Sequence, residues 1–256
     1  MFIPITDRNK RIWIQYHYVT LALIAACCAV YLLQMAGGED GFVRSIFGFG
    51  MIPSVLFGTR TLPEGLLHAP HWLTPITYIF LHGGLLHLAG NMLFLWVFGD
   101  NVEDSMGHRR FLAFFLMTGA IAAIVQGAVV PTSEAPMVGA SGAVSGVLGA
   151  YLVLHPRVQV WVLMFAWIPL RLPTWAVLGS WIAMQLGYSL LGDDLSDNVA
   201  WWAHVSGFFA GAALIRWFRM PHVLLWDTAA THGLQVSGLE LRRRGPWGGP
   251  WGDRKG

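Results

Sequence analysis

Long apolar stretches recur along this chain, separated by shorter polar segments. A helix needs about 20 mostly apolar residues to cross a hydrocarbon core of about 30 Å. Six stretches are candidates for such helices: roughly Tyr18 to Met35, Phe80 to Val102, Phe111 to Val130, Ser141 to Leu154, Trp175 to Leu191 and Trp201 to Phe218. The fourth stretch is short for a crossing, so hydropathy alone leaves the number of spans open.

The positions of the cations favour six spans. Cytoplasmic loops of membrane proteins are enriched in Lys and Arg. With six spans and a cytoplasmic N-terminus, the following basic residues all lie inside: Arg8, Lys10, Arg11, Arg109, Arg110, Arg157, Arg171, Arg216 and Arg219. The loop with Asp193, Asp194 and Asp197, which carries no cation, then lies outside. A seventh span at Val158 to Leu170 would spoil this pattern, so we place that run at the inner interface.

The predicted fold is therefore an all-α membrane protein, a bundle of six transmembrane helices with both ends in the cytoplasm. Residues 1–17 are a cytoplasmic N-terminal segment, residues 18–219 the core, and residues 220–256 a flexible cytoplasmic tail. Within the core, residues 37–79 form a long outer loop. We expect partial order in it, because long structureless loops are uncommon in compact domains.

The composition agrees with this class. Hydrophobic residues make up 55% of the chain and charged residues 12%, whereas soluble domains carry about 25% charged residues. The net charge of +2 is too small to indicate nucleic acid as a partner. Cys27 and Cys28 are adjacent in an apolar run, which indicates packed thiols and no disulfide framework.

Three polar clusters interrupt the apolar spans. Polar groups inside a span are costly, and a function is the default hypothesis for them. His87 and Asn91 lie four residues apart, on one face of the second span. Ser141 opens the fourth span, and His204 lies near the start of the sixth. These three spans run from outside to inside, so the clusters are expected at a similar depth in the outer half of the bilayer.

These side chains supply the parts needed for acyl transfer: a nucleophile, a general base and donors for an oxyanion. Ser141 begins a helix, where unpaired N–H groups can stabilise a developing negative charge. Small residues at helical spacing allow two helices to approach closely, and such residues follow the fourth and sixth spans: Gly142, Gly146, Gly149, Gly207 and Gly211. A Ser–His hydrogen bond across two helices requires such an approach.

The motifs around these residues resemble those of the rhomboid family of intramembrane serine proteases. They are His82-Gly-Gly-Leu-Leu-His87-Leu-Ala-Gly-Asn91, Gly139-Ala-Ser141-Gly142 and Ala203-His204-Val-Ser-Gly207. The resemblance covers roughly residues 18–219 and implies a Ser141–His204 dyad without a carboxylate. It also implies an oxyanion hole formed by the Ser141 backbone N–H with the His87 and Asn91 side chains.

The resemblance further implies single-span membrane proteins as substrates, cut near the outer face after local helix unwinding. We expect a multi-pass protein of the bacterial cytoplasmic (inner) membrane, surrounded by membrane lipid. Neither a metal nor another cofactor is expected.

Two positions depart from the family pattern. Many relatives carry an aromatic residue four positions after the nucleophile, stacked on the catalytic histidine, whereas this chain has Ser145. The orientation of His204 must then come from other neighbours. Relatives also often have Trp-Arg in the first outer loop, where this chain has Leu73-Thr74. That difference concerns the packing of the loop and leaves the chemistry unchanged.

No carboxylate is expected to orient His204. The nearest in sequence are Asp193, Asp194 and Asp197, and an ionised carboxylate inside an apolar helix bundle is strongly disfavoured. We expect packing and a bond to Ser141 to hold the imidazole.

Several polar residues also have structural readings. A serine beside glycine in a membrane helix is more often a packing residue than a nucleophile, and Asn91 could equally form an interhelical hydrogen bond. We expect a loop-anchoring role for His82. Asp100, Glu103 and Asp104 end the second span on the inner side, and we expect them to cap helices or bind loops.

Two other functions stay open. A metal-dependent hydrolase or metal transporter could use His82, His87 and His204 as ligands, although H-E-x-x-H is absent and no carboxylate or thiol lies at that depth. An inactive relative could bind membrane clients without cutting them. The presence of both Ser141 and His204 argues against it, because inactive relatives typically lack one of the pair.

Overall fold

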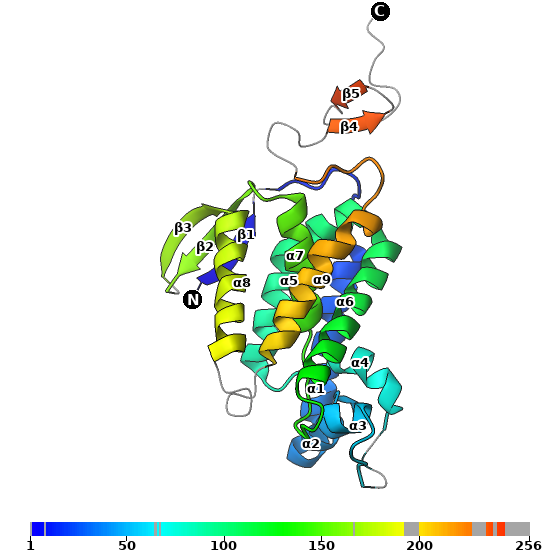
Figure 1. The fold of residues 1–256 in the computed structure, drawn as a ribbon. Coiled ribbons are helices and arrows are strands. Elements are labelled where there is room, and N and C mark those ends of the chain that lie inside the picture. Colours follow the sequence, from blue (N-terminus) through cyan, green and yellow to red (C-terminus); the bar gives the residue numbers. More distant parts are fainter. Residues whose placement is uncertain are drawn as a thin grey trace, which may run out of the picture.

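Helices carry most of the structure (Figure 1). The computed structural model describes residues 2–7, 9–63, 66, 68–165, 167–191 and 200–226, and the strands at 234–237 and 240–243. The long helices are α1 (Tyr18–Ala36), α5 (Leu85–Met106), α6 (His108–Val129), α7 (Ser141–Leu154), α8 (Thr174–Leu191) and α9 (Trp201–Phe218). Each of the six predicted apolar segments therefore corresponds to a helix.

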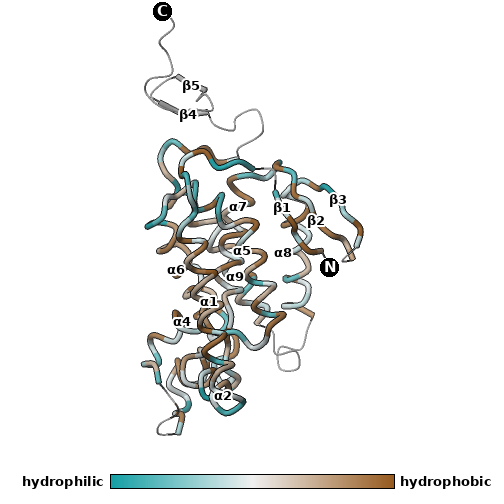
Figure 2. Tube along the Cα trace, turned by 180° about the vertical axis from the view of Figure 1, so that it is seen from behind, coloured by the Kyte–Doolittle hydropathy of each residue, from teal (hydrophilic) through white to brown (hydrophobic). Residues whose placement is uncertain are grey.

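By length and hydropathy, fewer than six of these helices qualify as membrane spans. Among the described residues, α1 and α6 are each long and apolar enough to cross a membrane, and α7 is apolar but shorter. The segments His71–Phe80 and Leu85–Met106, bent by 81°, make a third crossing if they form one span. Hydrophobic residues line the bundle helices, with hydrophilic segments mainly near the two ends (Figure 2). The number of six spans stays a prediction.

The second predicted span begins later than expected, with its helix starting at Leu85 and not at Phe80. The residues before it form the short 3-10 helix η2 (Tyr78–Phe80), and an extended turn through Gly83 and Gly84 follows. Two consecutive glycines disfavour a helix because they lose the most backbone entropy on ordering. His82 consequently lies in a turn ahead of the helix that carries His87.

The predicted outer loop, residues 37–79, contains several short helices, as expected. They are α2 (Gly38–Phe49), α3 (Pro53–Leu56), η1 (His71–Leu73) and α4 (Thr74–Thr77), followed by η2. Helices α2, α3 and α4 gather at one end of the bundle, at the bottom of Figure 1.

The predicted helical class holds for most of the structure, but the chain is not purely α-helical. Strands β1 (Phe2–Asp7), β2 (Gln159–Met164) and β3 (Ile168–Pro173) form an antiparallel sheet beside the bundle, in the order β1-β2-β3 (Figure 1). The run Val158 to Leu170 therefore lies mostly in a hairpin. Its valines and tryptophan favour strands, and a short apolar run gives no periodicity that separates strand from helix.

A second hairpin lies in the predicted tail. Strands β4 (Leu234–Ser237) and β5 (Glu240–Arg243) pair with each other. Most of the remaining tail, like the Asp193 to Asp197 loop, lies outside the described residues.

The predicted close approach of α7 and α9 is confirmed. A Cβ atom on Gly207 would lie 2.2 Å from the carbonyl oxygen of Gly142, and one on Gly211 would lie 1.9 Å from that of Gly146. Both distances are far below van der Waals contact, so only glycine fits at these positions. The contact fixes α9, with His204, against α7, with Ser141.

Acidic residues at the C-terminal end of α5 bind backbone N–H groups, as expected. Glu103 is fully buried and accepts hydrogen bonds from the N–H groups of Val19 and Thr20, at 3.0 and 2.7 Å. Asp104 accepts three more, from residues 12–14. The Glu103 bonds satisfy N–H groups at the start of α1, which have no partner within the helix. The Asp104 bonds attach the N-terminal segment to the bundle.

Candidate active site

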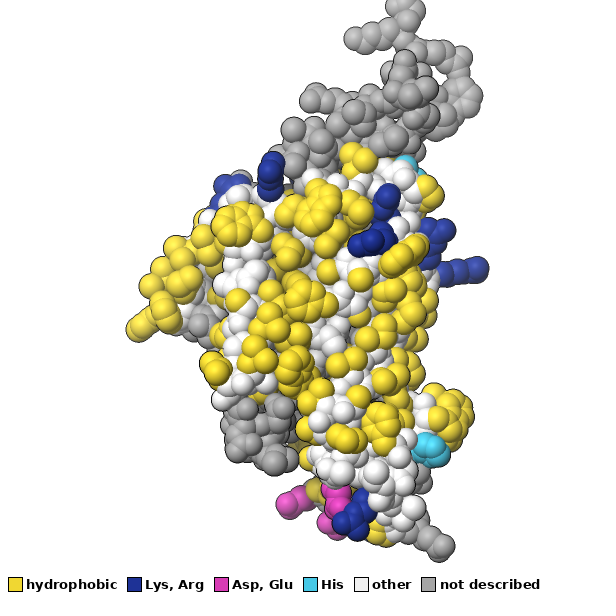
Figure 3. Space-filling model, in the orientation of Figure 1, with side chains coloured by type: hydrophobic (Ala, Val, Ile, Leu, Met, Phe, Trp, Pro, Cys, Tyr) yellow, Lys and Arg dark blue, Asp and Glu magenta, His cyan; other side chains and the backbone are white. Residues whose placement is uncertain are grey.

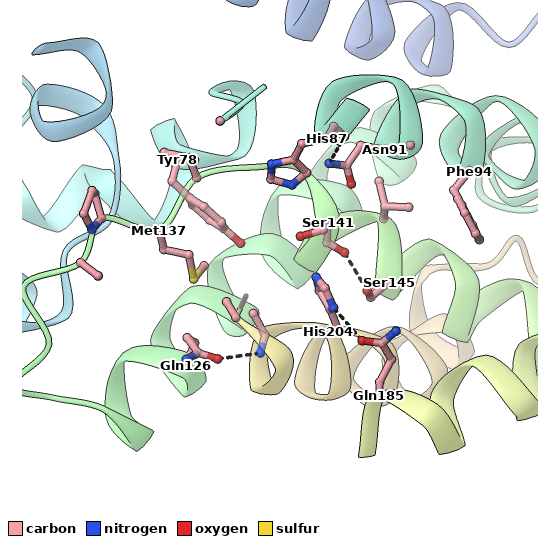
Figure 4. Close-up of a pocket in the computed structure, with 18 of the residues that line it drawn as sticks. Tyr78, His87, Asn91, Phe94, Gln126, Met137, Ser141, Ser145, Gln185 and His204 are labelled. Carbon is pink, nitrogen blue, oxygen red and sulfur yellow. Dashed lines mark hydrogen bonds between the residues drawn. The ribbon is translucent and has the colours of Figure 1, made fainter. Parts of the chain in front are cut away.

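One cavity is lined by all four residues that the sequence predicts for the site. It has a volume of about 790 Å³ and is lined by Ser141 of α7, His204 of α9, and His87 and Asn91 of α5. Figure 4 shows the four side chains around a common space. The structure thus brings together residues that are up to 117 positions apart in the chain, from 87 to 204.

Ser141 is the first residue of α7 and follows a constrained turn. Gly139 has a φ of +121°, a conformation that residues with a Cβ atom rarely adopt. A Cβ atom at this position would also lie 2.6 Å from Cε1 of His87. Gly139 therefore allows both the turn that presents Ser141 and the approach of the His87 ring.

His204 is held by three neighbours that the sequence did not reveal. Its Nδ1 lies 2.9 Å from Oε1 of Gln185, a residue of α8 that is only 4% exposed. The indole rings of Trp181 and Trp201 lie beside it, with ring centroids 6.2 and 6.0 Å from that of the imidazole. The orientation of His204 thus comes from α8 and from its own helix.

The expected bond between Ser141 and His204 is not formed: within the described part of the chain, Gln185 is the hydrogen-bond partner of the imidazole. Catalytic hydrogen bonds are often long without substrate and shorten in the complex. The expectation that Asp193, Asp194 and Asp197 play no part falls on residues outside the described ranges.

Ser145 has a local role. Its hydroxyl donates a hydrogen bond of 2.6 Å to the carbonyl oxygen of Ser141, one helical turn earlier, and the residue is 1% exposed. The position that is aromatic in many relatives therefore carries a hydroxyl bonded within its own helix. The aromatic neighbours of the imidazole are Trp181 and Trp201.

The predicted oxyanion donors lie on the opposite side of the cavity from Gln185 (Figure 4). Nδ2 of Asn91 donates a hydrogen bond of 3.0 Å to the backbone oxygen of His87. A side-chain amide has two N–H groups, so this intrahelical bond leaves Asn91 a second donor.

The His82 ring is fully buried and lies edge-on to that of His87, with centroids 5.4 Å apart. Its backbone N–H donates to Oε1 of Gln34, in agreement with a loop-anchoring role. Among the residues that the structure describes, no group of three or more His, Cys, Asp or Glu side chains is placed to hold a metal ion. His82, His87 and His204 thus form no metal-ligand set.

The sequence matches the family model of the Rhomboid domain over residues 69–221, more than half of the chain. The chain belongs to the rhomboid family. The family suggested by the three motifs is confirmed, and all four candidate site residues lie inside the matched range.

Curated relatives of this rhomboid include proteins from bacteria, animals and plants. It is 36% identical to "Rhomboid protease GluP" of Bacillus subtilis (strain 168) over 213 residues, which are 81% of this chain and 36% of the relative. It is 29% identical to "Presenilin-associated rhomboid-like protein, mitochondrial" of Homo sapiens over 168 residues, 62% of this chain and 43% of the relative. A third relative, "RHOMBOID-like protein 12, mitochondrial" of Arabidopsis thaliana, is 28% identical over 225 residues, 79% of this chain and 58% of the relative.

The chain spans between 36% and 58% of the length of these relatives. Two of them are named as mitochondrial. The comparisons therefore show that the chain is a rhomboid. They do not show that its membrane is bacterial.

Proposed function

We propose that this rhomboid is an intramembrane serine protease that cleaves single-span membrane proteins near the outer face of the bilayer. The observation that carries the proposal is the cavity in which Ser141, His204, His87 and Asn91 meet. The similarity to a bacterial rhomboid protease supports it.

The proposed roles of the residues are consistent with their places around the cavity. Nε2 of His204 accepts the proton of Ser141 Oγ as this oxygen attacks the carbonyl carbon of the substrate. The oxyanion is stabilised by the backbone N–H of Ser141 and by the side chains of His87 and Asn91. His204 then protonates the departing amine, and it activates the water that hydrolyses the acyl-enzyme.

The lining of the cavity supports the proposed place of cleavage. Besides the four site residues, it includes Ile46 and Pro53 of the predicted outer loop, and Ser133 and Met137 from the connection between α6 and α7. The proposal also includes six spans with both ends in the cytoplasm, a multi-pass location in a bacterial inner membrane, and surrounding lipid. The chemistry needs no cofactor.

The test measures two activities of the purified protein: labelling by a fluorophosphonate probe and turnover of a reporter substrate with one transmembrane span. Ser141→Ala and His204→Ala are expected to lose both, with unchanged thermal unfolding. His87→Ala and Asn91→Ala should lose ~10²–10³-fold in turnover, the usual effect of removing one oxyanion donor. Ser145→Ala is the matched control, because this hydroxyl is bonded within its own helix. Substantial turnover by Ser141→Ala would overturn the proposal.

A further inference from the structure

A buried amide on α8 contacts the imidazole from the side away from the nucleophile. The hydroxyl groups of Ser180 and Ser189 donate to backbone oxygens of α8 itself. Gln185 instead reaches across to α9, with its Oε1 2.9 Å from Nδ1 of His204. Its exposure of 4% means that water does not compete for this bond.

The chemistry of the amide determines which ring nitrogen carries the proton. An amide oxygen only accepts hydrogen bonds, so Nδ1 of His204 is the donor. In the neutral ring Nε2 is then unprotonated, and in Figure 4 the second ring nitrogen lies on the side of Ser141. This is the tautomer that a general base for Ser141 requires.

We propose that Gln185 is the positioning residue of this protease, and that its side-chain oxygen holds His204 in the tautomer that can deprotonate Ser141. The proposal rests on the proposed function of the Ser141–His204 pair. In soluble serine proteases a buried aspartate holds the histidine, and its replacement by asparagine lowers kcat by ~10⁴ through the wrong tautomer. A neutral amide accepts the same bond without placing a charge in the apolar bundle.

The placement of Gln185 makes the geometry of the Ser141–His204 pair depend on three helices. Ser141 lies on α7, His204 on α9 and Gln185 on α8. Helix α8 is peripheral, with side chains exposed at Trp175, Met184, Tyr188, Leu190 and Leu191. Outward displacement of α8 would remove the acceptor from the imidazole while α7 and α9 stay in contact through their glycines.

The first experiment compares kcat, KM and the pH–rate profile of three variants with the parent, on the same single-span reporter. Gln185→Met keeps length and apolar packing but removes the acceptor, and kcat should fall at least tenfold, with ~10⁴-fold as the upper bound, at nearly unchanged KM. Gln185→Glu keeps a side-chain oxygen that can accept the hydrogen bond of Nδ1, so it should restore most of kcat. Ser189→Ala, on the same buried face, is the matched control and should equal the parent.

Three outcomes overturn the proposal while leaving the protease assignment intact, provided that Ser141→Ala is inactive. The first is a folded Gln185→Met with parental kcat and pH profile. The second is an equal loss of kcat in Gln185→Met and Gln185→Glu. It would mean that the shape of the amide matters, and that its hydrogen-bond acceptor does not. The third outcome needs no variant, because it is measured on the parent protein. ¹⁵N NMR of the histidine-labelled parent would show neutral His204 with its proton on Nε2 and not on Nδ1. Turnover by Ser141→Ala would instead refute the protease assignment itself.

Discussion

Asp7 is a half-buried acid at the end of the molecule that the sequence predicts to be cytoplasmic, outside the predicted spans. It accepts hydrogen bonds from Nδ2 of Asn101, at 3.0 Å, and from the hydroxyl of Tyr151. Burial raises the pKa of Asp7 from 3.8 to about 7; the Tyr151 bond opposes the rise, and the neighbouring Asp100 charge adds to it. Asp100 itself pairs with Arg11 at 3.4 Å.

This raised pKa predicts a loss of stability as the pH increases. Between about pH 4 and 7, native Asp7 keeps a proton that the unfolded chain releases. The unfolding free energy should therefore fall by at most about 1.4 kcal/mol per pH unit in this window, the value for one proton. Asp7→Asn keeps an acceptor for Tyr151 and cannot ionise. We expect its stability advantage over the parent to be larger at pH 8 than at pH 5, measured by unfolding in mixed detergent micelles; an equal effect at both pH values would contradict this.

The residues of the candidate site differ in how far the sequence reveals them. Ser141, His204, His87 and Asn91 are predictable because each belongs to a short motif on an apolar segment, at a matching depth. Gln185 is a single amide in α8, with no motif around it, and its partner is 19 positions later. The contact depends on the packing of α8 against α9, which local patterns do not determine.

Elements were predictable where a local pattern specifies them. The six long helices follow from runs of apolar residues, and the α7–α9 contact follows from glycines at helical spacing. The sheet was missed because its pairing is not local: Phe2 pairs with Met164 across most of the chain. The sequence of a six-residue strand at the N-terminus does not indicate which distant strand it will pair with.

The glycines between α7 and α9 lead to a prediction about this pair of helices. Gly211→Ala would place a Cβ atom 1.9 Å from the backbone of α7, which forces the helices apart. Overpacking of this kind costs about 1–3 kcal/mol, and it moves His204 away from Ser141. We expect a lower unfolding temperature and loss of fluorophosphonate labelling.

The matched control for this prediction is Gly187→Ala. A Cβ atom there has no other atom within 4 Å, so the substitution should preserve labelling and gain up to about 1 kcal/mol of helix propensity. If Gly211→Ala were as stable and as reactive as Gly187→Ala, the close contact would not be needed to assemble the site.

The molecule as a whole has a basic end, an apolar middle and an end that carries the exposed acids of α2. In Figure 3, most Lys and Arg side chains gather at one end, and the magenta acidic side chains lie at the opposite end. The exposed cations Arg109 and Arg110 lie in the first turn of α6, while Glu39 and Asp40 lie in the first turn of α2. Because basic residues are retained in the cytoplasm, this polarity favours the orientation that the sequence predicts.

Cysteine accessibility can test that orientation on intact cells. In a background with Cys27→Ala and Cys28→Ala, Glu39→Cys should react with a membrane-impermeant maleimide, since this position is exposed on α2. Arg157→Cys, exposed beyond the C-terminal end of α7, should react only after the membrane is permeabilised. The cavity is lined by residues of the α2 end, so the same measurement shows which side of the membrane is nearer to the site. The reverse labelling pattern would place Ser141 in the cytoplasmic half and would refute cleavage near the outer face, while leaving the dyad chemistry intact.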